Sequence, residues 1–167
     1  MFNMRDLLIN IVQRQKQEAQ EILKSATVVR EVSSQLQSSL DLKQIKAVIG
    51  PRRSGKSTLA HQVLSNRYGE GKYAYINFED DSLPTSLDYE ILEQCLTQLY
   101  PSSTYIFFDE IQSYPRWEQL LNRLERVEKK IIISGSNSKL LSSELSFYPS
   151  CWIPQTDCRL HLTTRRC

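Results

Sequence analysis

The residues with the clearest chemistry form a glycine-rich segment, Gly50-Pro51-Arg52-Arg53-Ser54-Gly55-Lys56-Ser57. It fits the pattern G-x-x-x-x-G-K-[ST], and it lies between a predicted strand and a predicted helix, the context that this pattern requires. Glycine lets the backbone curl closely around an anion, while backbone N–H groups and the positive end of the helix attract phosphate oxygens. The sequence therefore predicts a phosphate-binding loop here.

Individual side chains of this segment have separate predicted tasks. Lys56 is expected to reach the β- and γ-phosphates of a nucleotide, and the Ser57 hydroxyl is expected to bind Mg²⁺. Thr58 follows them as a neighbour of the bound phosphates or as a residue that packs behind the loop. Arg52 and Arg53 could contact phosphate, a partner subunit or only water, since exposed arginines are common.

A second group of candidate residues ends an apolar stretch of the chain. Asp109 and Glu110 directly follow the predicted strand Tyr105–Phe108. Ligands of parallel sheets bind at the carboxyl ends of strands, so these acids would face the phosphate loop. We expect Asp109 to contact Mg²⁺, directly or through water, and Glu110 to polarise an attacking water as a general base. The alternative is a pair of solvated acids that begins a turn.

Polar residues also follow two other predicted strands. Ser136 and Asn137 could orient the attacking water or sense the γ-phosphate, and they could equally cap the helix that follows, as Ser and Asn readily do. Residues 77–81, which include Asn77 and Glu79, either border the same site or form only a turn, and their composition favours the turn.

The hydrophobic pattern supplies the framework that would bring these candidates together. Apolar spacing predicts helices over residues 2–24, 31–40, 55–66, 86–99, 116–127 and 139–145, and strands over residues 46–49, 73–78, 105–108 and 131–133. This alternation predicts an α/β three-layer sandwich, with a parallel sheet of at least four strands and helices on both faces. The apolar face of the first helix is interrupted at Gln15-Lys16, which indicates a bend or weak packing.

Composition excludes several classes of protein. The 167 residues suffice for one domain with its own core, and 40% apolar with 24% charged residues is globular composition. A net charge of +2 does not support a nucleic-acid or membrane-surface partner. No apolar run approaches a membrane span and no secretory signal is visible, so we expect a cytoplasmic protein. The four cysteines form no CxxC pair, so neither a disulfide nor a zinc site is expected.

Three motifs in order resemble those of the AAA+-like P-loop ATPases, and most closely those of a prokaryotic group of predicted ATPases. The motifs are GPRRSGKSTL, FFDEIQSYPRWEQLLNRL and IIISGSNSKLLSSEL, and the resemblance runs from about Val28 to Ser146. It implies the P-loop NTPase fold, with the fourth strand between the first and the third, and it implies ATP and Mg²⁺ as ligands. By the same resemblance, Lys56 and Ser57 lie at the phosphates and the metal, Asp109 at the metal, and Glu110 is the catalytic base.

The resemblance stops near Ser146, whereas members of that group continue with a further strand and further domains. We therefore divide the chain into an N-terminal helical segment (1–45), an ATPase core (46–146) and an atypical tail (147–167), and we hypothesise a truncated or frame-shifted chain. Strand 46–49 would then lie at an edge of the sheet, where residues 158–164 are expected to pair.

The leading functional hypothesis is ATP binding with Mg²⁺-dependent hydrolysis. One alternative is an ATP-binding interaction or regulatory module without turnover. A phosphotransferase is a third alternative, but Glu110 directly after Asp109 favours the activation of water. A homo-oligomer or a protein partner is compatible with the sequence, and Arg116 and Arg123 are candidates for an arginine finger.

Overall fold

The computed structural model describes residues 3–25, 32–136 and 151–152 of the chain. The helices are α1 (Met4–Ser25), α2 (Val32–Ser39), α3 (Lys56–Tyr68), α4 (Tyr89–Leu99), α5 (Trp117–Arg126) and a 3-10 turn, η1 (Ile111–Ser113). The strands are β1 (Ile45–Ile49), β2 (Ala74–Asn77), β3 (Tyr105–Asp109), β4 (Lys130–Gly135) and β5 (Cys151–Trp152). The predicted helix 139–145 lies outside the described residues.

The strands form one parallel sheet in the order β2-β3-β4-β1-β5. Strand β4 lies between β1 and β3, with Ile133 beside Ala47 on one side and Phe108 on the other. This confirms the α/β sandwich and the strand order that the family resemblance implied. As a consequence, the loop after β1 and the acids at the end of β3 lie close together at the carboxyl ends of the parallel strands, on either side of β4.

The expectation that β1 would be an edge strand was wrong. Strand β5 pairs in parallel with β1, with Cys151 beside Ile45 and Trp152 beside Lys46. This pairing satisfies backbone groups of β1 that an edge would leave unpaired. Residues 158–164, which were expected to take this place, lie outside the described residues.

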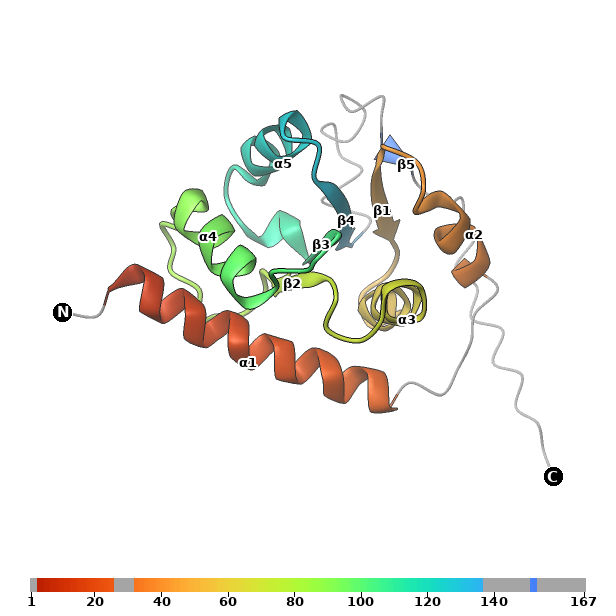
Figure 1. Ribbon diagram of the computed structural model, residues 1–167, viewed down its shortest axis with the longest axis horizontal. Coiled ribbons are helices and arrows are strands. Elements are labelled where there is room, and N and C mark those ends of the chain that lie inside the picture. Colours follow the sequence, from red (N-terminus) through yellow and green to blue (C-terminus); the bar gives the residue numbers. More distant parts are fainter. Residues whose placement is uncertain (1–2, 26–31, 137–150, 153–167) are drawn as a thin grey trace.

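Helices cover both faces of the sheet (Figure 1), and one apolar cluster lies on each face. Alternate residues of β3 belong to opposite clusters, because successive side chains of a strand point to opposite faces. One cluster joins the sheet to α4 and α5, through Leu92, Leu96, Trp117, Leu121, Ile106 and Phe108. The other joins it to α2 and α3, through Leu36, Leu59, Val63, Leu64, Tyr105 and Phe107.

Helix α1 runs along the outer side of β2 and reaches from α4 to α3 (Figure 1). Its first half contributes Leu8 and Val12 to the cluster beneath α4, and Ala19 belongs to the cluster of α3. Leu8 and Val12 are completely buried, and burial of such a side chain contributes about 1.5–3 kcal/mol. The helix is therefore packed against the same fold as the sheet. No helix among the described residues is long and apolar enough to cross a membrane.

Two helix boundaries differ from the predicted ones for identifiable reasons. Helix α4 begins three residues late, because the Asp88 carboxylate accepts hydrogen bonds from the N–H groups of Glu90 (2.8 Å) and Ile91 (3.3 Å) and thereby caps the helix. Helix α3 extends to Tyr68 and ends at Gly69, which adopts a φ of +96° and donates its N–H to the carbonyl of Ser65.

Candidate nucleotide-binding site

The loop between β1 and α3 folds back over the start of the helix. The N–H of Gly50 donates to the carbonyl of Gly135 (3.4 Å), and that of Ser54 donates to the carbonyl of Pro51 (3.2 Å). Gly55 has a φ of +77°, a left-handed conformation that favours glycine. The loop therefore reverses its direction just before α3, whose first N–H groups have no partner within the helix and are available to an anion.

Lys56 lies across the mouth of this loop. Its ammonium donates to the carbonyl of Pro51 (3.2 Å) and lies 3.2 Å from Oε1 of Glu110. The side chains of Lys56 and Glu110 are only 6% and 13% exposed. The two motifs that the sequence predicts as parts of one site are therefore in direct contact.

Asp109 is buried at the end of β3 among hydroxyl groups. Ser134 donates a hydrogen bond to Oδ1, and Tyr75 donates one to Oδ2 (3.4 Å). Burial raises the pKa of the Asp109 carboxyl, although hydrogen bonds from Ser134 and Ser57 act in the opposite direction. Burial also raises the pKa of Tyr75 well above its usual value, so this phenol remains a donor. A cation beside Asp109 would stabilise the charged carboxylate that burial disfavours.

Glu110 is held by its neighbours at both the backbone and the side chain. Its φ of +48° is unusual for a residue with a side chain. Its N–H donates to Oγ of Ser134 (3.2 Å), and Nε2 of Gln112 donates to its Oε2 (2.5 Å). Backbone strain of this kind clusters at functional sites.

These groups surround one open cavity of about 710 Å³, within the size range of small-molecule sites. The lining residues come from the loop and α3 (Arg52, Arg53, Gly55, Lys56, Ser57, Thr58), the strand ends (Tyr75, Asn77, Glu79, Asp109, Glu110) and α1 (Glu18, Ile22). The cavity thus combines the phosphate loop with acidic groups at the carboxyl ends of parallel strands.

A family model that describes an AAA domain matches residues 42–150 of the chain. The chain belongs to the AAA family. This confirms the family resemblance, although the matched segment begins later than Val28 and runs slightly beyond Ser146. Helices α1 and α2 both precede it.

The chain spans about a quarter of the length of the curated relative that it matches. The chain is 36% identical over 127 residues to the uncharacterized protein MJ1544 of Methanocaldococcus jannaschii, and the match covers 75% of the chain and 28% of that relative. A DNA replication initiation factor is a structural neighbour with 19% identity and a TM-score of 0.46, covering 69% of this chain and 41% of that one. PCH-2 of C. elegans gives 13% identity and a TM-score of 0.45, covering 86% and 41%.

The other residues that the sequence predicted for the site differ in whether they line the cavity. Arg52, Arg53 and Thr58 all line the cavity. The Arg52 side chain is 76% exposed and forms an ion pair with Glu79 (3.0 Å). Ser136 follows β4 directly and is half-buried, but it is not among the described residues that line the cavity. Asn137 lies outside the described residues, so its predicted role stays a prediction.

Residues 77–81 both form a turn and border the site, so the preference for a turn alone was incomplete. The N–H of Glu79 donates to Oδ1 of Asn77 (2.9 Å), and both side chains line the cavity. Arg123 pairs with Glu90 (3.2 Å) and Glu93 (3.7 Å) of α4. No observation tests Arg116 or Arg123 as an arginine finger.

Sequence reasoning missed four polar residues that contact the candidate groups, and one of them is Tyr75, which donates to Asp109. Ser134 bridges Asp109 and Glu110, and the only signal was a serine that interrupts the apolar pattern of β4. Gln112 donates a hydrogen bond to Glu110, and its only signal in the sequence was its place in the acidic motif. The expectation of a bend or weak packing at Gln15 was wrong. Helix α1 is continuous there, and the Gln15 side chain is completely buried and forms hydrogen bonds with Asn77 and Asp80.

The donor set at the end of β3 fits magnesium. Asp109 and Ser57 offer the hard oxygen ligands that Mg²⁺ prefers, and Mg²⁺ is usually held by one or two such groups together with phosphates and waters. Within the described part of the chain, no group of three or more His, Cys, Asp or Glu side chains could hold a metal ion. Two oxygen donors from the protein match a magnesium ion whose other ligands are phosphates and waters.

Proposed function

We propose that this AAA protein binds ATP together with Mg²⁺ in the cavity between the ends of β1 and β3, and that it hydrolyses the bound ATP. The observation that carries the proposal is the contact between Lys56 of the phosphate loop and Glu110 of the acidic motif, 3.2 Å apart at one cavity. ATP as the nucleotide rests on the family, whereas the phosphate chemistry rests on the site itself.

The proposed phosphate contacts come from the loop and the start of α3. Backbone N–H groups over Gly50–Ser57 and the positive end of α3 would hold the phosphate chain, and Lys56 would supply a mobile positive charge. Arg53 and Thr58 line the same cavity and are positioned to contribute. Pro51 and Ser54 act through the backbone, since they hold the loop closed.

Ser57 and Asp109 are the proposed magnesium ligands. When bound, the ion would neutralise part of the phosphate charge as bond cleavage proceeds. Tyr75 and Ser134 would keep the Asp109 carboxylate in one orientation, because each donates to a different oxygen.

Glu110 is the proposed general base for an attacking water. In the structure its carboxylate is engaged by Lys56 and by Gln112. A bound triphosphate would offer Lys56 a stronger anionic partner and thereby release one oxygen of Glu110. The base would then be freed only when substrate is present.

The same engagement of Glu110 supports a second candidate function, an ATP-binding module without turnover. If Lys56 and Gln112 retained Glu110 after nucleotide binding, the site would bind ATP but would not activate water. The two functions predict the same binding and differ in the release of phosphate.

The first test is a titration of the purified chain with Mg·ATP. We expect saturable binding that is lost in Lys56→Ala and retained in Lys129→Ala. Lys129 is an exposed lysine directly before β4, so it lies at the amino ends of the parallel strands, away from the cavity. A folded wild-type chain that does not bind Mg·ATP would contradict the proposal. Phosphate release by the wild-type chain then decides between turnover and binding alone.

A further inference from the structure

Helix α1 precedes the segment that the AAA family model matches, yet it forms part of the candidate site. Gln15, Glu18 and Ile22 are spaced at three and four residues, so they share one face of the helix. Glu18 and Ile22 line the cavity, and Gln15 bonds to the end of β2 next to it. The face of α1 toward the sheet is thus also a wall of the cavity.

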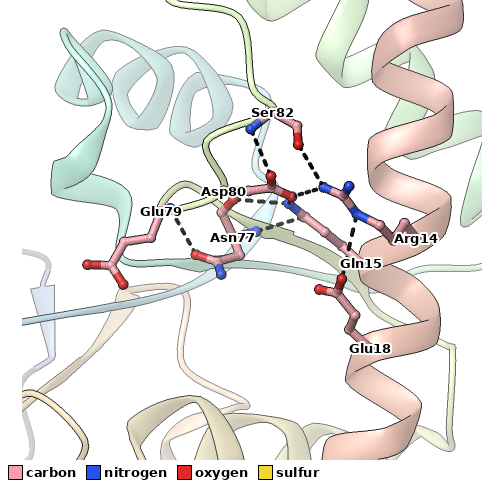
Figure 2. A network of polar contacts seen from close by, with 7 residues as sticks. All are labelled: Arg14, Gln15, Glu18, Asn77, Glu79, Asp80 and Ser82. Atoms are coloured by element: carbon pink, nitrogen blue, oxygen red, sulfur yellow. Dashed lines mark hydrogen bonds and ion pairs between the residues drawn. The ribbon is translucent and has the colours of Figure 1, made fainter.

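The Gln15 side chain pairs with β2 as a peptide group of a neighbouring strand would. Its Oε1 accepts from the N–H of Asn77 (2.9 Å), and its Nε2 donates to the carbonyl of the same residue (3.1 Å), as Figure 2 shows from close by. In the described sheet β2 is the terminal strand, so these two backbone groups have no strand partner on that side. The buried amide supplies the missing donor and acceptor, whose loss would leave polar groups unsatisfied.

Asp80 extends this attachment to the loop after β2. Its carboxylate accepts from Gln15 (2.8 Å), Arg14 (2.5 Å) and the N–H of Ser82 (3.0 Å) (Figure 2). Partial burial alone would raise the pKa of Asp80, but the hydrogen bonds from Gln15, Arg14 and Ser82 outweigh it and lower the pKa to about 2. The carboxylate therefore stays charged and bonded to α1 at neutral pH.

The loop held in this way leads directly to the phosphate loop. The side chain of Asn77 accepts the N–H of Glu79 (2.9 Å), and the carboxylate of Glu79 pairs with Arg52 (3.0 Å). Asn77 and Glu79 both line the cavity. A continuous series of polar contacts therefore connects Gln15 of α1 with Arg52 of the phosphate loop.

We infer that α1 is a structural part of the nucleotide site, and that Gln15 is a positioning residue which couples the docking of α1 to the binding of a nucleoside triphosphate. This inference rests on the proposed function, because it assumes that the cavity takes the phosphates of ATP. Coupling of this kind is reciprocal. Docked α1 strengthens nucleotide binding, and bound nucleotide to the same extent stabilises docked α1.

The test compares two substitutions of the same type on one helix in the full chain. Gln15→Met keeps most of the buried volume but removes both bonds to Asn77, whereas Gln17→Met alters an exposed glutamine two residues away. We expect Gln15→Met to raise the Kd for Mg·ATP by about tenfold, within the roughly 5–150-fold range of coupled sites. Gln17→Met should bind as the wild-type chain does.

Hydrogen exchange distinguishes coupling from a merely structural role of Gln15, because a merely structural role would not change the effect of Mg·ATP on exchange in α1. We expect Mg·ATP to slow exchange over residues 4–25 in the wild-type chain and in Gln17→Met, and to have a smaller effect in Gln15→Met. The wild-type measurement alone decides the matter if Gln15→Met does not fold, since unchanged exchange in α1 on saturation with Mg·ATP would overturn the inference.

The outcomes separate this inference from the proposed function. A wild-type chain that fails to bind Mg·ATP contradicts the proposed function and the inference with it. If the wild-type chain binds, but Gln15→Met and Gln17→Met bind with equal affinity, the proposed function stands and the coupling through Gln15 is overturned.

Discussion

The ammonium of Lys56 and the carboxylate of Glu110 form a nearly buried ion pair with a separation of 3.2 Å. Each side chain belongs to a different motif: Lys56 begins α3 after the loop that follows β1, and Glu110 follows β3. Strand β4 lies between β1 and β3. Two charges this close and this shielded from water interact strongly, so a change at one alters the other. The pair also restrains the proposed base until a ligand competes for the lysine.

Glu110→Gln is expected to retain Mg·ATP binding and to lose turnover by about 10²–10⁴-fold, the usual contribution of a general base. Binding should be as tight as in the wild-type chain or tighter, because Lys56 no longer interacts with a carboxylate. The measurements are a binding titration and the rate of phosphate release. Glu21→Gln, on an exposed part of α1, serves as the matched control. Undiminished turnover in Glu110→Gln would exclude Glu110 as the base.

Ser134→Ala is expected to reduce turnover by about 10–100-fold, the usual effect of removing a group that orients a metal ligand. The substitution removes the hydroxyl that donates to Asp109 and accepts from the N–H of Glu110. Ser134→Thr keeps a hydroxyl and should retain most of the activity. Comparison with Ser136→Ala shows which serine of this segment matters: a larger loss in Ser136→Ala would favour the residue that the sequence predicted.

Asp109→Asn is expected to remove the gain in ATP affinity that Mg²⁺ provides. The amide can keep polar contacts with its neighbours but lacks the charge that attracts the ion, so Mg·ATP should bind about tenfold more weakly, equal to about 1.4 kcal/mol. With Mg²⁺ removed by a chelator, the variant should bind ATP at least as tightly as the wild-type chain. An equal loss of affinity with and without Mg²⁺ would assign Asp109 a structural role instead.

His61 is expected to make the fold sensitive to acid. Its ring is buried between β2 and α3, with Nδ1 2.8 Å from the hydroxyl of Tyr73, and burial lowers the pKa of His61 from 6.5 to about 3. Between these values the unfolded chain binds a proton that the folded chain does not. The free energy of unfolding therefore falls as the pH drops below 6.5, by up to about 1.4 kcal/mol per pH unit.

His61→Gln offers a polar group to Tyr73 without a charge that titrates. Urea unfolding at a series of pH values should show a shallower loss of stability for this variant between about pH 6.5 and pH 4.5. Parallel curves for the variant and the wild-type chain would mean that His61 does not control the acid sensitivity.

Local patterns in the sequence were sufficient to predict the fold class and the main candidate residues. The segment from Gly50 to Ser57 is continuous, and its chemistry depends on neighbours along the chain. Asp109 and Glu110 are recognisable because they end an apolar strand. In a parallel sheet the carboxyl ends of all strands lie on the same side, so the sequence could predict that the two motifs meet.

Contacts between distant segments could be decided only by the tertiary structure. Ser134 reaches Asp109 because the register of β3 and β4 places them together, whereas the sequence alone directed attention to Ser136 and Asn137. Gln15 looked like a defect in an apolar face, since nothing near it in sequence shows that it satisfies the edge of β2. The sequence by itself determined which groups could bind phosphate and metal, because that chemistry is local. Only packing determined which polar side chains orient them, because those partners are distant in the chain.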